Sequence, residues 1–483
     1  MYAWAIYNRI QKEGQYMVFS SFTFLIYFLP AFLLLYFLIP KDWRNAVIFA
    51  GSLVFYYYGV KDHPFYLILM LITTIVNHLA AKCMGRSSYR LRRLWLCLGM
   101  FWNIGCLFVF KYLDFLTTNL NRLLALIKVS IEIPCLNLVL PIGISFYTFQ
   151  ISSYLIDVYR KEIPPERSLL TLGTYLCMFP QLIAGPIVTY SQVRRQMRQR
   201  SHSSRNLEEG MREFTIGLSL KVLIANRVGG LWSQIGSIGY ESISCPLAWL
   251  GIFSYSFQIY FDFYGYSLMA KGLGRMMGFT FPDNFDNPYL SCTMTEFWRR
   301  WHITLGSWFR EYVYIPLGGN RKGLYRNLFL VWMLTGLWHG ASWNFILWGL
   351  SICLIISVEK LGLRQIFNKI PVLGHLYMIF LIPLSWLLFA VTDLGQIKIY
   401  LMRLFPILGQ TAGAVYSQDF FIYGKACFWP LLAALLCCTG LPRKLYEAKK
   451  YSFLMTFGLV ILFWACVYCM YLGLDDPFLY YQF

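Results

Sequence analysis

Long runs of apolar residues alternate along the chain with short segments rich in lysine and arginine. A helix needs about 20 apolar residues to cross the hydrocarbon core of a bilayer, and a helix satisfies its own backbone hydrogen bonds there. The candidate spans are 18–39, 45–60, 65–82, 94–116, 137–157, 213–232, 247–266, 374–391, 428–442 and 452–473. The pattern therefore predicts an all-α polytopic membrane protein.

Three further apolar stretches, 168–190, 302–318 and 327–358, are interrupted by glycine or proline. Placing the basic segments in the cytoplasm, as the positive-inside rule requires, puts the N-terminus outside. Each of the three stretches then begins and ends near cytoplasmic charge, so we expect it to enter the bilayer and return. In the third stretch we expect Gly336, Gly340 and Gly349 to break the helix. The alternative is a pair of full spans joined by a short external loop.

The composition supports a membrane protein with one domain. Of 483 residues, 58% are hydrophobic and 13% are charged, whereas soluble domains average about 45–50% and 25%. The formal charge of +19 lies in the short basic segments, which favours lipid headgroups over nucleic acid as its partner. Most of the 13 cysteines lie in apolar runs and are expected to pack as small hydrophobic residues. Residues 1–16 are interpreted as an N-terminal extension without function, and residues 17–483 as a single membrane domain.

His339 lies in one of the most apolar stretches, between Trp338 and Gly340. An imidazole is costly to bury in hydrocarbon, so an intramembrane histidine indicates a functional site. It is also the side chain best suited to proton transfer near neutral pH. The alternative is a core histidine held by a neighbouring carbonyl. His302, 37 positions earlier, follows Trp298 and Arg299, and it could instead anchor the membrane interface.

Other polar or aromatic residues in apolar surroundings are candidates for lining a substrate tunnel. Tyr147 and Gln150 share one helical face, although helix packing explains such residues equally well. Arg310 could instead pair with Glu311 or face lipid headgroups. The full set of lining candidates is Asn344, Trp338, Trp298, Arg299, Arg310, Tyr147, Gln150 and Asp262.

Familiar catalytic motifs are missing from the sequence. It contains no G-x-S-x-G elbow, no P-loop and no H-E-x-x-H pair, and we predict no metal site and no bound cofactor. The simplest chemistry is a histidine that acts directly as a general base on a substrate group.

Together these residues resemble the membrane-bound O-acyltransferase family, and in particular its bacterial alginate O-acetyltransferase branch. The similarity extends over nearly the whole chain from Met17. It is carried by the segments 17–21 (MVFSS), 141–150 (PIGISFYTFQ), 179–186 (FPQLIAGP), 297–302 (FWRRWH), 338–340 (WHG) and 476–483 (DPFLYYQF).

The resemblance implies that His339 is the essential histidine and His302 a second functional histidine. It implies a ring of about ten to eleven transmembrane helices around a thinned centre, with broken or re-entrant helices and a tunnel. It also implies an acyl donor on the cytoplasmic side, acetyl-CoA or an acylated carrier, and an exported polysaccharide or a periplasmic partner acetyltransferase outside. The expected location is the bacterial cytoplasmic membrane, with many passes.

We therefore expect transfer of a short acyl group, acetyl above all, onto a hydroxyl group for O-acetylation of an exopolysaccharide such as alginate. His339 would remove the hydroxyl proton, and Asn344 or a free backbone N–H would stabilise the oxyanion. D-alanyl transfer from a carrier protein towards teichoic acid is the alternative within the family. A proton-coupled polysaccharide transporter is the alternative from another class, but it should show internal repeats, which the sequence lacks.

Overall fold

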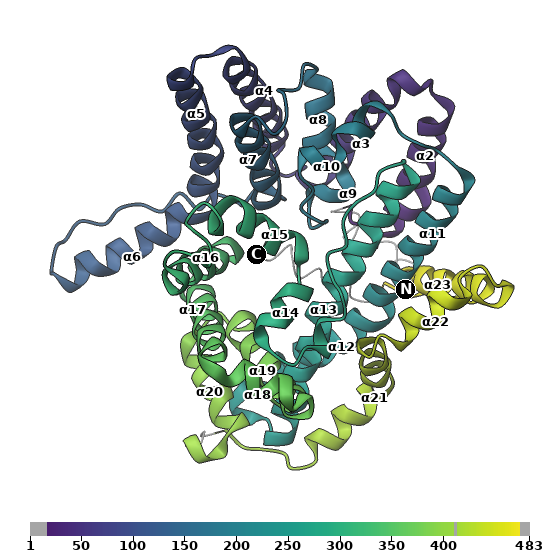
Figure 1. Cartoon of the computed structure of the whole chain (residues 1–483). Helices are drawn as coiled ribbons and strands as arrows, with labels where there is room; N and C mark the ends of the chain where they lie inside the picture. The colour runs from purple at the N-terminus through teal and green to yellow at the C-terminus, as the bar shows by residue number, and fades with distance from the viewer. Residues whose placement is uncertain (1–16, 410–412, 474–483) are drawn as a thin grey trace. The chain divides into compact units, whose positions relative to one another are not determined.

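The computed structural model describes residues 17–409 and 413–473, and every regular element within these ranges is helical (Figure 1). This confirms the all-α prediction. Residues 1–16 and the terminal motif 476–483 lie outside the described residues. Seven described helical segments are long and apolar enough to cross a membrane: Phe65–Arg86, Tyr89–Leu126, Ser204–Ile238, Trp343–Phe367, Pro371–Ala390, Asp419–Cys438 and Phe453–Tyr471. Shorter apolar helices such as Thr23–Leu38 fall below that length, so the count of ten to eleven stays a prediction.

The chain forms two compact units, which are described separately. The first holds the residues up to Met211 together with Ala270–Pro282, and the second holds Arg212–Met269 and the residues from Asp283 onward. Two long helices, α11 (Ser204–Ser219) and α13 (Cys245–Met276), contribute residues to both units. The ring, the tunnel and the single domain from residue 17 stay predictions.

The first unit is built from short and medium helices. They are η1 (Thr23–Phe28), α2 (Leu29–Leu38), η2 (Lys41–Trp43), α3 (Arg44–Gly59), α4 (Phe65–Arg86), α5 (Tyr89–Leu107), η3 (Phe108–Tyr112), α6 (Leu113–Leu126), α7 (Ile144–Arg160), α8 (Leu169–Cys177), α9 (Phe179–Leu182) and α10 (Tyr190–Arg198). Gly143 precedes α7 with a φ of 73°, and a Cβ there would lie 2.4 Å from the Leu182 carbonyl oxygen. Only glycine fits this start, because it adopts positive φ freely and has no Cβ.

A buried carboxylate joins the loop before α8 to α10. Glu166 accepts hydrogen bonds from the Tyr190 hydroxyl at 2.5 Å and from Arg198 at 3.1 Å. It also accepts from the backbone N–H groups of Arg167 and Ser168. Burial alone would raise the pKa of the Glu166 carboxyl, but these donors outweigh burial and hold the pKa below its ordinary value. The ionised side chain therefore stabilises this part of the fold.

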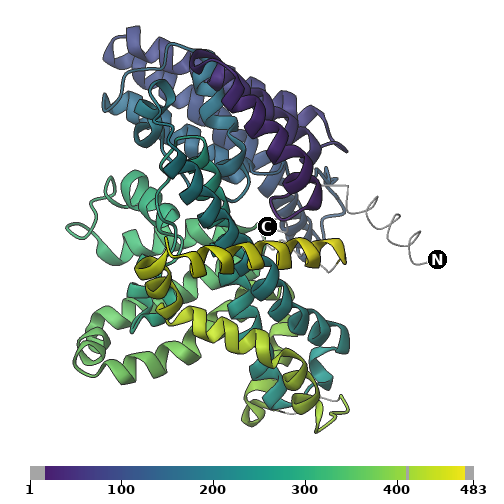
Figure 2. The same ribbon diagram turned by 90° about the vertical axis from the view of Figure 1, so that its right-hand side faces the viewer.

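The second unit contains the remaining helices, of which α21 to α23 are yellow in Figure 2. They are η4 (Leu220–Ala225), α12 (Asn226–Ile238), η5 (Tyr240–Ser242), η6 (Pro288–Leu290), α14 (Met294–Arg300), α15 (Ile303–Phe309), η7 (Arg310–Tyr314), α16 (Leu324–His339), α17 (Trp343–Val358), η8 (Glu359–Leu363), α18 (Arg364–Lys369), α19 (Pro371–Ala390), α20 (Leu394–Leu404), η9 (Pro406–Leu408), α21 (Asp419–Cys438), α22 (Leu441–Lys449) and α23 (Phe453–Tyr471).

The apolar stretch 327–358 forms a helical hairpin of α16 and α17. Gly340 lies at the break between them, as predicted, but the prediction that Gly336 and Gly349 also break the helix is wrong. These two glycines lie inside the helices where the hairpin is tightest. A Cβ on Gly336 would lie 2.4 Å from the Phe345 carbonyl oxygen, and one on Gly349 would lie 2.4 Å from that of Trp332. Small residues let helix backbones approach this closely.

The other irregular stretches are also divided into short helices. Residues 168–190 contain α8 and α9, and residues 302–318 contain α15 and the π-helical η7. In the third stretch, α17 continues through η8 and α18 into the span Trp343–Phe367, which is long enough to cross the bilayer. Helix α16 has 16 residues, or about 24 Å at 1.5 Å per residue, which is shorter than the hydrocarbon core of about 30 Å. Whether these stretches re-enter the membrane stays a prediction.

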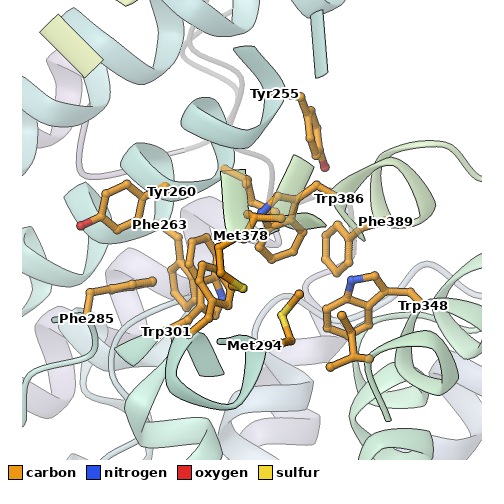
Figure 3. Packing of buried hydrophobic residues seen from close by; sticks show 14 of the residues in the cluster. Tyr255, Tyr260, Phe263, Phe285, Met294, Trp301, Trp348, Met378, Trp386 and Phe389 are labelled. Carbon is orange, nitrogen blue, oxygen red and sulfur yellow. The ribbon is translucent and has the colours of Figure 1, made fainter. Parts of the chain in front are cut away.

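An aromatic cluster forms the core of the second unit (Figure 3). The side chains of Trp301 and Trp386 lie 4.8 Å apart between ring centroids, and Trp348 and Phe389 lie 5.2 Å apart. Offset and edge-to-face ring pairs of this kind add to the stabilisation from burial. The cluster therefore provides a rigid support for the polar groups set among it.

Candidate active site

His302 lies in the turn between α14 and α15, where it precedes the first residue of α15. Its φ is 43°, a left-handed conformation that is uncommon for a residue other than glycine. Two backbone hydrogen bonds fix this turn against a neighbouring loop, from Asp286 N–H to the Arg300 carbonyl and from Ile303 N–H to the Asn284 carbonyl, both 2.9 Å long. The surrounding backbone therefore imposes the conformation that places the imidazole.

Asn284 fixes which nitrogen of His302 carries the proton. The Asn284 Oδ1 atom lies 3.0 Å from His302 Nδ1, and it also accepts from the Thr304 hydroxyl and the Thr304 N–H. The Asn284 Nδ2 atom donates to the Ser267 hydroxyl at 3.1 Å. These four contacts agree on one orientation of the amide, so Oδ1 faces the histidine. A neutral His302 must then carry its proton on Nδ1, which leaves a lone pair on Nε2.

The Nε2 atom of His302 is buried and has no hydrogen-bond partner among the described residues. The whole side chain is only 2% exposed, and its ring packs edge-on against Phe263 at 4.6 Å. His302 lies outside the seven candidate spans. Burial lowers the pKa of its imidazole, so the ring is neutral near neutral pH. An unpaired buried acceptor costs free energy.

His339 is the last residue of α16 and is 6% exposed. Its ring lies 5.0 Å from Phe389 and 5.2 Å from Trp348, both edge-on. Trp338 contacts both histidines, with ring centroids 4.8 Å from His339 and 5.9 Å from His302. Two histidines that are 37 positions apart in the sequence thus both pack against the indole ring of Trp338. The side chains around them are aromatic rather than aliphatic.

The structure brings only some of the other candidates to this place. Trp298 belongs to the same aromatic cluster, 5.4 Å from Trp348, and its indole nitrogen is buried without a partner among the described residues. Arg299 and Arg310 are exposed. Asn344 is fully buried near the start of α17, where its amide donates to the Leu388 carbonyl and accepts from Ser342. Its role as an oxyanion donor stays a prediction.

Asp262 is one half of a buried ion pair. Its carboxylate lies 2.6 Å from the Lys221 ammonium, and both side chains are 1% exposed. Lys221 belongs to the π-helical segment η4, and π-helical turns are frequent at functional sites. Lys221 was not among the predicted site residues, although a lysine within the apolar run 213–232 is itself an indication of a buried partner.

Tyr147 and Gln150 belong to α7 in the first unit. Both are buried, and the Tyr147 hydroxyl and both polar atoms of the Gln150 amide have no hydrogen-bond partner among the described residues. Buried polar side chains are normally satisfied. Like His302, these two residues therefore place buried polar atoms without partners among apolar side chains. That they line a tunnel stays a prediction.

Asn284 and Ser267 were also missed as site residues. Their contact joins residues 17 positions apart, which a local sequence pattern does not display. One sequence signal does point to Asn284. It belongs to the polar pair Asp283–Asn284, which lies between Phe281-Pro282 and Phe285. As for metals, no group of three or more His, Cys, Asp or Glu side chains in the described ranges is placed to hold an ion.

Comparison with known proteins tests the family. Residues 160–402, which include both histidines and Asn284, match the model of the membrane-bound O-acyltransferase family. The chain belongs to this family. The resemblance inferred from its motifs is confirmed, and the protein is a membrane-embedded acyltransferase.

Several relatives are named for the acylation of alginate, peptidoglycan or teichoic acid. The chain is 39% identical to the probable alginate O-acetylase AlgI of Pseudomonas aeruginosa over 384 residues, covering 78% of this chain and 73% of the relative. It is 36% identical to the peptidoglycan O-acetyltransferase of Helicobacter pylori over 419 residues, covering 78% of each. It is 29% identical to the teichoic acid D-alanyltransferase of Streptococcus thermophilus over 248 residues, covering 47% of this chain and 59% of the relative.

Proposed function

We propose that this acyltransferase moves an acetyl group from a cytoplasmic thioester to a hydroxyl group of an exported polysaccharide, in the cytoplasmic membrane of a bacterium. Two observations support acetyl transfer. The relatives named for O-acetylation match 78–83% of the chain, and those named for D-alanylation match less than half of it. An exported polysaccharide is proposed as the acceptor because these relatives are named for alginate and peptidoglycan.

The observation that carries the chemistry is the pair of buried histidines on Trp338. In the proposed reaction, His339 takes the proton from the acceptor hydroxyl while the hydroxyl oxygen attacks the thioester carbonyl. The tetrahedral intermediate then collapses, the C–S bond breaks, and the proton passes from His339 to the departing thiolate. The products are an O-acetyl ester and a free thiol, so no covalent enzyme intermediate is needed.

His302 supports this step as a hydrogen-bond acceptor. Its Nε2 atom is buried and unpaired among the described residues, and Asn284 keeps the proton on Nδ1. A neutral acceptor in a water-poor site binds a substrate hydroxyl without first losing bound water. The role of His302 is therefore to orient the acceptor beside His339.

The donor and the partners follow from the same proposal. Acetyl-CoA or an acetylated carrier protein is anionic, and the exposed cations Arg299 and Arg310 would attract either from solution. On the outer side, the acetyl group passes to the polysaccharide directly or through a partner acetyltransferase. No bound cofactor takes part in the proposed steps.

Mass spectrometry of the exported glycan tests the proposal. A strain that lacks this protein is complemented with the wild type, with His339→Ala, with His302→Ala or with His63→Ala, a histidine of the α3–α4 loop that serves as a control. We expect O-acetyl groups with the wild type and the control, none with His339→Ala, and a strong reduction with His302→Ala. Full acetylation by His339→Ala, at equal membrane levels, would refute the base role.

The alternatives predict different donors. D-alanyl transfer requires a D-alanyl carrier protein, so membranes supplied only with acetyl-CoA or acetylated carrier would show no transfer. A polysaccharide transporter would export glycan without consuming any acyl donor. Transfer of radiolabelled acetyl groups into glycan by purified membranes therefore distinguishes the proposed acetyl transfer from both alternatives, and transfer from a labelled D-alanyl carrier protein distinguishes the alternatives from each other.

A further inference from the structure

A large apolar groove lies in the second unit, apart from the two histidines. Its volume is about 1110 Å³, slightly above the roughly 300–1,000 Å³ of small-molecule pockets. The groove lies between α19 and α21, with part of α13 lining it. Its apolar lining includes Leu250, Phe257, Ile379, Pro383, Phe428 and Leu432.

The groove is lined by helices that are expected to contact the hydrocarbon of the bilayer. Helices α19 and α21 are both candidate spans, and only 6% of the apolar window of α21 is buried inside the protein. A hydrocarbon chain gains little by leaving the bilayer for such a groove, because lipid tails are as apolar as leucine. The shape of the groove would therefore admit any lipid. Selective binding of one kind of lipid headgroup requires a polar group at the groove.

Lys425 supplies that polar group. It lines the groove from α21 and is exposed, six residues after Asp419 at the start of the helix, or about 9 Å along the axis. The Asp419 carboxylate accepts from the N–H and the hydroxyl of Ser244 instead. Among the described residues, Lys425 makes no ion pair, and the groove lining contains no acidic side chain. A cation within a membrane span requires a partner.

We propose that this groove is a binding site for a phospholipid with an anionic headgroup. The lipid phosphate pairs with the Lys425 ammonium, and an acyl chain fills the apolar groove between α19 and α21. The charge complementarity selects the anionic lipid, and the length and apolar lining of the groove select a chain-bearing ligand over a soluble phosphate. The site is independent of the acyl-transfer reaction.

Native mass spectrometry of the full-length protein, stripped of lipid in detergent, measures this binding. The probes are phosphatidylglycerol, phosphatidylcholine with the same chains, and soluble glycerol 3-phosphate. We expect one phosphatidylglycerol to bind about fivefold more tightly than phosphatidylcholine, the factor for one basic residue near an anionic headgroup. Glycerol 3-phosphate should not compete.

Variants separate the charge from the groove. Lys425→Ala should abolish the preference without weakening phosphatidylcholine, and Lys425→Arg should retain it. Lys398→Ala removes an exposed lysine of α20 that does not line the groove, so it should behave as the wild type. Gly424→Phe should weaken both lipids, because a Cβ at Gly424 meets only Leu250 Cδ2, at 3.6 Å, and the ring would enter the groove.

Three results would overturn the proposal. One is a preference for phosphatidylglycerol that persists in Lys425→Ala. Another is lipid binding that is unchanged in Gly424→Phe while thermal unfolding shows an intact fold. The third is a dimer that Gly424→Phe dissociates, which would mean that a second copy of the chain covers the groove.

Discussion

Replacing Asn284 by alanine tests whether His302 acts through one fixed tautomer. The substitution removes the acceptor of the His302 Nδ1–H and of the Thr304 N–H. Each buried donor left without a partner costs about 1–3 kcal/mol, so the two donors that lose their acceptor predict a loss of roughly 2–6 kcal/mol in stability. Without Asn284 the ring proton can move to Nε2, and that tautomer cannot accept a hydrogen bond from substrate.

The effect on turnover should exceed what the loss of stability explains. Removing the partner that orients a metal-bound histidine costs about 10–100-fold, and we expect a decrease in kcat of the same order for Asn284→Ala. The assay is transfer of labelled acetyl groups by purified protein at a temperature where the variant remains folded. Ser267→Ala removes only the acceptor of the Asn284 Nδ2 group and is the matched control, with activity within about threefold of the wild type.

Asn284→Asp separates tautomer control from structural support. A carboxylate also accepts from the His302 Nδ1–H, so this variant should retain more activity than Asn284→Ala. Its negative charge favours the imidazolium and raises the pKa of His302. Protonation removes the Nε2 lone pair, so activity should begin to fall at a higher pH than in the wild type. Equal losses in both variants, with the same pH profile, would refute the reasoning and leave Asn284 a purely structural residue.

Three further predictions concern stability. Glu166→Gln should lower the free energy of unfolding by about 2 kcal/mol in thermal melts. The contribution of the carboxylate should be present above its unfolded pKa and disappear as the pH falls through the lowered folded pKa, and a melting temperature unchanged at pH 7 would contradict this. Asp262→Ala should cost about 3–5 kcal/mol because it strands the Lys221 charge, whereas replacing both partners by apolar residues should cost less; equal costs would argue against the ion pair. Gly336→Ala should lower stability by about 1–3 kcal/mol, while Gly230→Ala, which meets no atom within 4 Å, should not.

Apolar runs predicted the helices well where the apolar run and the helix begin and end at nearly the same residues. The run 452–473 corresponds to α23 at Phe453–Tyr471, and 374–391 to α19 at Pro371–Ala390. The run 428–442 missed the first nine residues of α21, because Asp419 and Lys425 interrupt the hydropathy there. A charge within a helix lowers the apolar signal without ending the helix, so such boundaries depend on tertiary contacts that the sequence does not display.

The site was predictable only in part, for a related reason. His339 and His302 stand out because an imidazole is rare in an apolar run. Asn284 does not stand out, because its importance depends on a loop that folds back over 18 positions to reach His302. The Lys221–Asp262 pair similarly joins residues 41 positions apart. Rare residue types are visible in one sequence, whereas the partners that orient them come from the fold.

His302 combines two local costs at one residue, and this combination argues for function. Its left-handed backbone costs about 1–3 kcal/mol, and its unpartnered buried nitrogen costs about 1–3 kcal/mol more. Glycine would adopt the same backbone without the first cost, and an apolar side chain would avoid the second. A residue chosen only for stability would avoid both costs. Because the aromatic packing around Trp338 and the hydrogen bond from His302 Nδ1 to Asn284 Oδ1 hold the ring in place despite both costs, the buried, unpaired Nε2 lone pair is best explained as an acceptor for a hydrogen bond from substrate.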